Sequence, residues 1–201
     1  MLPSLRVVTW NARALLQATG AKASLKRQYL MKLKLNSSIV SLQEVRQYAL
    51  QLREFVNGIS DTVTIHSSFC GDTHEERVRG GVAILLPELG RLGGHPVHSR
   101  SVPLVAGRVL HVIVDAGDVQ LDIFNVHNHD LSVEQVSMVV RVIRFAKGFA
   151  AADPTKRMVT VNGDFNFSSV EAVALHMPQA AVRRAARQHH AKAAVLGQAL
   201  A

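Results

Sequence analysis

Two carboxylates, a histidine and two amides occupy positions from which they could act on a phosphodiester. Glu44 and Asp164 offer the oxygen ligands that hold Mg²⁺ (or Mn²⁺) against a bound phosphate. Asn11 and Asn166 are neutral amides that could bond phosphate oxygens without adding negative charge. His127 could donate a proton or polarise the phosphate. These residue types supply most of what hydrolytic cleavage of a phosphodiester needs.

Each of these residues also has a simpler explanation. A carboxylate that follows a strand, such as Glu44 or Asp164, is commonly a turn former or a helix cap, and Asn11 could cap the segment after it. The histidines in 127–130 could bind zinc, although two rings on one loop do not complete a site and no cysteine cluster supports one. Arg108 could be a surface cation at the start of a strand. Structural and catalytic roles therefore both stay open at the level of single residues.

The elements that must position these side chains are β-rich runs. Short apolar runs predict strands at 5–10, 38–42, 63–68, 81–86, 108–114, 119–125 and 157–161. Asn11, Glu44, His127 and Asp164 each lie just past the end of one of these runs. Since polar residues beyond strand ends gather at one edge of such sheets, we expect these four to meet there.

Three segments predict helices that cover the sheets. Residues 21–35 suit a basic amphipathic helix, which is more often a solvated face than a binding surface. Residues 47–56 suit a second helix, closed by Asn57 and Gly58. Ser132 and Gln135 form a capping-box signature before a helix over 133–150. Its apolar face is expected to contain Val136, Val139, Val140, Ile143 and Phe145 or Ala146. The alternation of strands and helices predicts an α/β fold.

Composition and charge restrict the class of protein. The 201 residues are 48% apolar, enough for one sizeable domain. The net charge of +8 favours a polyanion as partner, with nucleic acid as the natural one. Cys70 is the single cysteine, which excludes an internal disulfide and fits a reducing compartment. The sequence has no signal-peptide core and no long apolar stretch. We therefore expect an intracellular protein, with the nucleus among its candidate compartments. We expect neither a membrane nor an obligate protein as its partner.

Six short blocks, in this order, resemble the endonuclease/exonuclease/phosphatase superfamily across residues 5–167. The blocks are Thr9-Trp10-Asn11, Ser41-Leu42-Gln43-Glu44, Arg79-Gly80-Gly81-Val82-Ala83-Ile84-Leu85, Gly107-Arg108-Val109, Asn125-Val126-His127-Asn128 and Gly163-Asp164-Phe165-Asn166. Within the superfamily, the TWNAR, SLQE and NVHNHD stretches are most similar to the endonuclease domains of non-LTR retrotransposons and their apurinic endonuclease relatives.

The resemblance implies a two-sheet, four-layer α/β sandwich and a set of roles. Glu44 would bind the divalent cation with Asn11 close to it, and Asp164 would orient the attacking water. Asn166 would contact the phosphate, and His127 or Asn128 would assist at the phosphoryl oxygen. Arg108 matches an arginine at the start of a strand, and with Arg13 it is a candidate contact to phosphate or nucleic acid.

Two departures from the family pattern stand out. Arg13 replaces an aspartate that some apurinic endonucleases carry, which removes a possible second metal ligand. The family pattern also ends with a Ser-Asp-His segment, and nothing after Asn166 matches it. We therefore expect a domain over 1–177 that is incomplete at its C-terminus, followed by an Ala/Arg/His-rich helical tail over 178–201.

Three functions are compatible with the sequence. The first is Mg²⁺-dependent hydrolysis of DNA by an endonuclease, with loss of activity possible because the last catalytic segment is missing. The second is a non-catalytic remnant that binds nucleic acid in a salt-dependent manner. The third is hydrolysis of a small phosphoester by the same fold, against which the positive charge counts.

Overall fold

The structure is a computed structural model that describes residues 6–36, 39–46, 48–58, 63–71, 73, 75–76, 79–87, 91–92 and 95–166. The predicted domain boundary at 177 and the tail over 178–201 lie outside these residues. The strands are β1 (Val7–Asn11), β2 (Ile39–Gln43), β3 (Val63–Ser68), β4 (Val82–Pro87), β5 (Arg91–Leu92), β6 (His95–Val105), β7 (Val109–Ala116), β8 (Val119–His127) and β9 (Arg157–Asp164). The helices are η1 (Leu15–Gln17), α1 (Gly20–Asn36), α2 (Ala49–Asn57) and α4 (Val133–Ala152).

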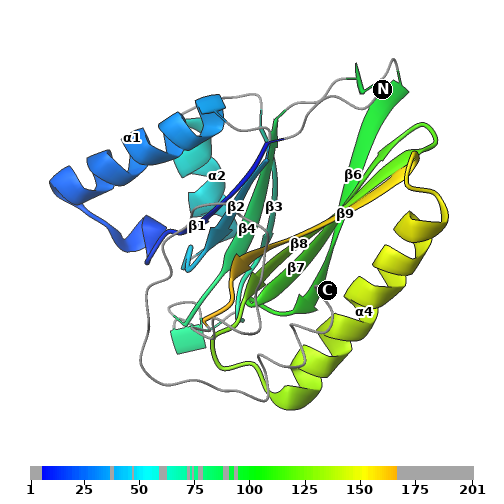
Figure 1. The fold of residues 1–201 in the computed structure, drawn as a ribbon. Coiled ribbons are helices and arrows are strands. Elements are labelled where there is room, and N and C mark those ends of the chain that lie inside the picture. The colour runs from blue at the N-terminus through cyan, green and yellow to red at the C-terminus, as the bar shows by residue number, and fades with distance from the viewer. Residues whose placement is uncertain are drawn as a thin grey trace, which may run out of the picture.

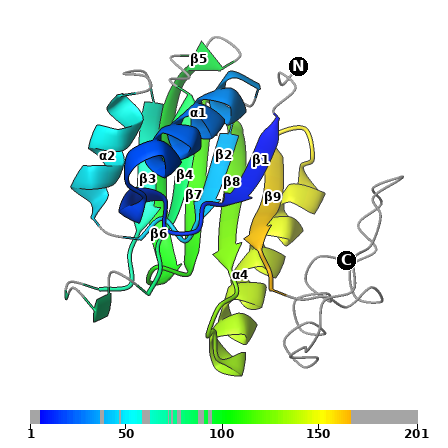
Figure 2. The same ribbon diagram turned by 90° about the vertical axis from the view of Figure 1, so that its left-hand side faces the viewer.

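Two sheets pack face to face and are covered by helices on both outer sides, as Figures 1 and 2 show. The first sheet has the order β1-β2-β4-β3, and the second has the order β5-β6-β7-β8-β9. The pairs β1–β2 and β8–β9 are parallel, and the other neighbours are antiparallel. The predicted four-layer sandwich is confirmed. No helix in the described part of the chain has the length and apolar composition of a membrane span.

Three apolar clusters hold the four layers together. One lies under α1 and α2 and includes Leu30, Leu42 and Leu52. A second fills the space between the sheets, with side chains from β2 and β4 against those from β7 and β8. The third lies between the second sheet and α4 and contains Phe124 and Ile143. Buried apolar area of this kind is the main source of stability in a domain of this size.

The predicted strands are all present, and one long strand was not predicted. β6 has eleven residues and pairs with β7, yet its sequence carries Pro96 and Pro103. Proline breaks the pattern by which strands are identified, because it cannot donate to a sheet. Pro96 lies before Val97, the first residue of β6 that pairs with β7, and Pro103 borders a β-bulge in the β6–β7 register. Strand ends and bulges are the places where a sheet tolerates proline.

The predicted helices are also present. Ser132 accepts from the Gln135 backbone, so the capping box of α4 is confirmed. Of the two alternatives at the end of the apolar face of α4, Ala146 is buried, while Phe145 is 69% exposed. On α1 the spacing of Leu25, Tyr29, Leu30 and Leu33 predicts one apolar face, and this prediction was wrong in part. Leu30 is buried, but Leu25 is 65% exposed. Five residues at 3.6 per turn place Leu25 about 140° away from Leu30.

A buried amide joins the two sheets near the carboxyl end of β8. The Asn125 Nδ2 group donates to the carbonyl oxygens of Leu42 and Ala83, both at 2.9 Å. Its Oδ1 atom accepts from Gln43 Nε2 at 2.6 Å, and Gln43 also bonds to Thr9. Asn125 and Gln43 are almost completely buried. Hydrogen bonds between these buried groups replace the hydrogen bonds that they would form with water. Loss of either side chain therefore leaves buried donors or acceptors without a partner.

We predict that Asn125→Ala lowers the free energy of unfolding by about 3 kcal/mol, because it strips partners from several buried polar groups. Asn162→Ala provides a matched control. Asn162 is the register partner of Asn125 on β9, and its buried side-chain atoms have no hydrogen-bond partner. Its loss should change stability by less than about 1 kcal/mol. Urea unfolding of both variants measures the difference, and equal losses would contradict the proposed role of Asn125.

Candidate active site

Four strands end at one edge of the sandwich and bring the predicted residues together. Asn11 is the last residue of β1, Glu44 follows β2, His127 is the last residue of β8 and Asp164 is the last residue of β9. Within each sheet the two strands concerned run parallel, so their carboxyl ends meet at the same edge. The predicted meeting of these four residues at one edge is confirmed.

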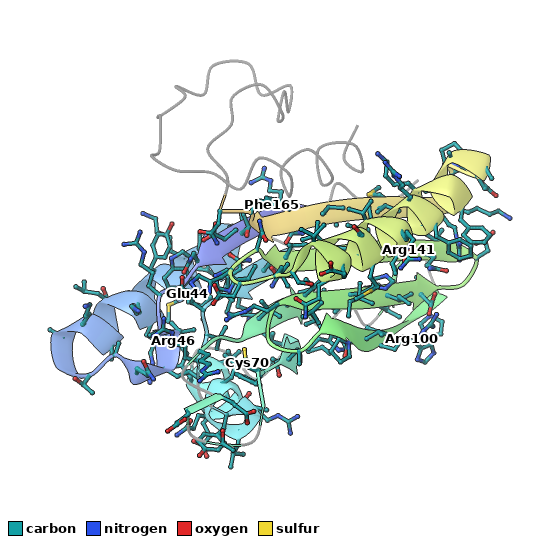
Figure 3. The ribbon with its side chains drawn as sticks, turned by 90° about the horizontal axis from the view of Figure 1, so that it is seen from below. Glu44, Arg46, Cys70, Arg100, Arg141 and Phe165 are labelled. Atoms are coloured by element: carbon teal, nitrogen blue, oxygen red, sulfur yellow. The ribbon has the colours of Figure 1, made fainter. Side chains whose placement is uncertain are left out.

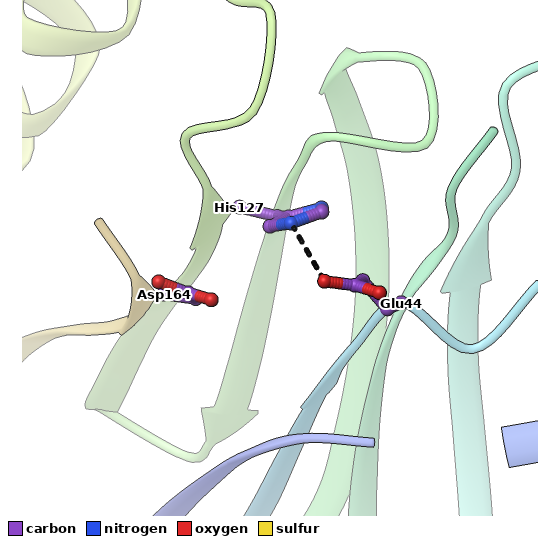
Figure 4. Close-up of side chains that lie close together, drawn as sticks. All are labelled: Glu44, His127 and Asp164. Atoms are coloured by element: carbon purple, nitrogen blue, oxygen red, sulfur yellow. Dashed lines mark ion pairs between the residues drawn. The ribbon is translucent and has the colours of Figure 1, made fainter. Parts of the chain in front are cut away.

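Glu44, His127 and Asp164 face a common space. One ligand atom from each of the three lies within 4.8 Å of the others. His127 Nε2 is 3.7 Å from Glu44 Oε1, the contact drawn as a dashed line in Figure 4. Both carboxylates are partly buried, and His127 is only 1% exposed. Two acidic groups and an imidazole are thus gathered from both sheets.

Asn11 holds the two carboxylates in place. Its Nδ2 group donates to Glu44 Oε1 at 2.8 Å and to Asp164 Oδ2 at 2.6 Å. Its Oδ1 atom accepts from the Arg13 backbone at 3.1 Å, which orients the amide. A single amide therefore positions both acids, as the two hydrogens of an NH₂ group allow.

The loop after β9 is fixed by Asn128 and by the geometry of Gly163. Asn128 donates through its backbone to the Asp164 carbonyl at 2.8 Å and through Nδ2 to the Phe165 carbonyl at 2.7 Å. The Asn166 backbone donates to Asp164 Oδ1 at 3.1 Å. A Cβ at Gly163 would approach the Val126 carbonyl oxygen to 1.9 Å, so only glycine lets β9 pair this closely with β8. Together with the bond from Asn11 to Oδ2, the bond from Asn166 to Oδ1 orients both carboxylate oxygens of Asp164.

Arg108 lies behind His127. Its NH1 group donates to the Arg79 carbonyl at 3.0 Å and is 3.4 Å from His127 Nδ1. Since a guanidinium only donates, Nδ1 is the accepting nitrogen and the neutral ring carries its proton on Nε2. Burial, followed by the charge of Arg108, lowers the pKa of His127 to about 4. The ring is therefore a neutral donor whose Nε2 faces the carboxylates.

The donor set fits a small, hard cation. Glu44 and Asp164 present carboxylate oxygens, and one or two carboxylates are enough for Mg²⁺, which keeps several waters. His127 Nε2 is buried and has no hydrogen-bond partner. A ligand in the common space would supply one. His129, the other ring of the predicted zinc alternative, pairs instead with Asp130 at 2.7 Å.

A cation lies beside Glu44. Arg46 NH2 is 3.3 Å from Glu44 Oε2, and both residues are labelled in Figure 3. Arg13 is exposed on the loop that follows β1. Arg46 was not predicted as a functional residue, because a single arginine after the SLQE block carries no signal of its own.

The comparisons with solved structures identify the fold. Truncated TDP2 from Caenorhabditis elegans has a TM-score of 0.54 and 17% identity over 81% of this chain and 62% of that chain. D. rerio TDP2 complexed with single strand DNA product has a TM-score of 0.53 and 17% identity, over 84% and 63% of the two chains. Both are members of the endonuclease/exonuclease/phosphatase superfamily. The chain has the endonuclease/exonuclease/phosphatase fold.

A further structure with this fold is the human Nocturnin catalytic domain with bound sulfate anion. It has a TM-score of 0.52 and 14% identity, over 83% of this chain and 66% of that chain. The chain thus spans less than two thirds of the length of each of these structures. No protein-family model and no curated protein matches the sequence.

The predicted residues differ in where the structure places them. Asn11, Glu44, His127 and Asp164 surround one space, whereas Asn128 and Arg108 support it from behind. Besides Arg46, sequence reasoning missed the supports Gln43 and Asn125, which lie inside apolar strands. A polar residue within a buried run was the available signal for both.

His127 predicts a specific dependence of stability on pH. The pKa of about 4 in the folded protein lies below the ordinary value of 6.5, so the unfolded chain binds a proton first. The free energy of unfolding should therefore fall as the pH is lowered from about 6.5 to about 4. In urea unfolding with EDTA present, His127→Gln should show a smaller fall across this window. An unchanged pH dependence in the variant would show that His127 is not held neutral by the fold.

Proposed function

We propose that the protein is a divalent-metal-dependent phosphodiesterase that hydrolyses nucleic acid, with DNA as the substrate. The observation that carries the proposal is the meeting of Glu44 and Asp164 with a neutral His127 at the joint edge of both sheets. Two acids held by one amide are the arrangement that a cation and an attacking water need. The relatives of the same fold support this class of reaction.

Each side chain has a distinct part in the proposed reaction. Asp164, oriented by Asn11 and the Asn166 backbone, would position the attacking water and accept its proton. His127 would donate from Nε2 to a phosphoryl oxygen, where negative charge develops. Arg108 would keep the imidazole in that tautomer.

Mg²⁺ is the proposed cation, with Mn²⁺ as the other choice. Glu44 and Asp164 would hold it, since hard cations prefer carboxylate oxygens. When bound, the cation supplies positive charge beside the phosphoryl oxygens. His127 is excluded as a ligand in the assigned tautomer, because its Nε2 carries a hydrogen.

The closeness to retrotransposon endonucleases is a finer part of the proposal. It is supported by the TWNAR, SLQE and NVHNHD stretches. Cleavage assays on duplex DNA with and without an abasic site would distinguish retrotransposon-like endonucleases from apurinic endonucleases. Equal cleavage of both duplexes supports the retrotransposon-like assignment. Cleavage confined to the abasic duplex contradicts that assignment.

Nicking of supercoiled plasmid tests the proposed function. The 201-residue protein should nick the plasmid in Mg²⁺ or Mn²⁺ and stop in EDTA. Glu44→Gln and Asp164→Asn keep the shape of each side chain but remove its charge, and each should lower the rate by a factor of about 10² or more. Asp118→Asn is the matched control, because this carboxylate is exposed at the turn between β7 and β8. It should nick like the wild type.

The outcomes separate the candidate functions. If both Glu44→Gln and Asp164→Asn still nick the plasmid, the nicking comes from a contaminant and the proposal is refuted. A folded protein that binds DNA without nicking it would instead be the non-catalytic binding protein. Hydrolysis of a small phosphodiester without any action on DNA would identify the small-phosphoester alternative.

A further inference from the structure

Two loops and one helix near Glu44 carry positive charge from three separate parts of the chain. Arg13 lies on the loop after β1, Arg46 lies on the loop after β2, and Lys22 and Lys26 lie on the first turns of α1. We refer to these four residues as the cationic rim. Nothing in the proposed reaction uses them. Among the residues that the structure describes, the carboxylate that pairs with the rim is Glu44, which Arg46 binds.

Lys26 ties the rim together. Its ammonium donates to the carbonyl oxygens of Ala12 at 2.7 Å and of Arg13 at 2.5 Å, so α1 is fastened to the loop that presents Arg13. Burial lowers the pKa of Lys26, the charges of Lys22 and Arg46 lower it further, and Glu44 raises it. The charges of Lys22 and Arg46 are therefore close enough to repel that of Lys26.

The backbone beside the site is held in an unfavourable conformation. Six non-glycine residues of the described chain have left-handed φ angles, and all lie in loops at this edge: Arg13, Ala14, Glu44, Arg46, Asp130 and Asn166. Side chains other than glycine rarely adopt this region, and such strain concentrates at functional sites. Two of the six are the rim arginines, with φ angles of 43° and 52°.

The fold maintains this strain through hydrogen bonds. Ala12 and Ala14 donate to the carbonyls of Gln43 and Glu44 at 2.9 and 2.8 Å, which continues the β1–β2 pairing beyond the strand ends. The rim is thus attached to the same segment that carries Glu44. Arg46 Nε is buried and has no hydrogen-bond partner, which leaves one donor of this guanidinium unused.

We propose that the cationic rim binds backbone phosphates of a nucleic-acid strand next to the phosphate that is cleaved. This inference rests on the proposed function and adds the surface that would bind the strand beside the site of cleavage. A substrate with a single phosphate would bind in the site itself and would not need four cations beside the site. A strand that passes the site offers a phosphate at every nucleotide and relieves the mutual repulsion of the rim.

Salt-dependent binding tests the rim without requiring cleavage. A fluorescently labelled single-stranded oligonucleotide of about 20 nucleotides is titrated in EDTA at several KCl concentrations. Arg13→Gln/Lys22→Gln should reduce the slope of log Kobs against log[salt] by about 1.4, since each phosphate contact contributes about 0.7 on a single strand. Arg141→Gln/Arg144→Gln removes the same charge from exposed positions on α4 and should leave the slope close to that of the wild type.

The results decide between the rim and the general charge of the protein. Equal slopes for the two double variants, or a folded wild type that binds no oligonucleotide, would overturn the inference. If the Arg13 variant fails to fold, Lys22→Glu against Arg141→Glu repeats the comparison at single exposed positions. Rim-dependent binding by a protein that does not nick plasmid would refute the proposed hydrolysis while leaving the rim intact.

Discussion

The hydrogen bond between Gln43 and Asn125 is the interaction on which the arrangement of the site depends. It joins the inner faces of the two sheets at the edge where their parallel strands end. Glu44 is the next residue after Gln43, and His127 is two residues after Asn125 on the same face of β8. The bond therefore sets the separation of an acid from one sheet and an imidazole from the other.

The remaining contacts refine this separation. Asn11 bridges Glu44 to Asp164, and Asn128 fixes the loop that follows Asp164. Arg108 determines which nitrogen of His127 can donate. The result places two negative charges next to a neutral ring in a protein of net charge +8. The electrostatic field of the net positive charge attracts a polyanion, while the two carboxylates form a locally negative site that favours a cation.

The sequence predicted the architecture and the central residues because both follow from local patterns. Apolar runs identified the strands, and polar residues at their ends identified Asn11, Glu44, His127 and Asp164. β6 was missed because its prolines contradict a strand by local rules, and what makes them tolerable is tertiary: Pro96 lies before the β6–β7 pairing begins, and Pro103 borders a β-bulge. The bond from Lys26 to the Arg13 loop could not be found in this way, since it joins segments that no spacing relates.

Titration with Mn²⁺, followed by electron paramagnetic resonance, tests most directly whether these contacts assemble one metal site. The account predicts a single saturable ion per chain, displaced by Mg²⁺ and lost in the combined Glu44→Gln/Asp164→Asn variant. The Asp118→Asn variant should bind like the wild type. Folded protein that binds no ion, or binds it equally well without the two carboxylates, would contradict the account.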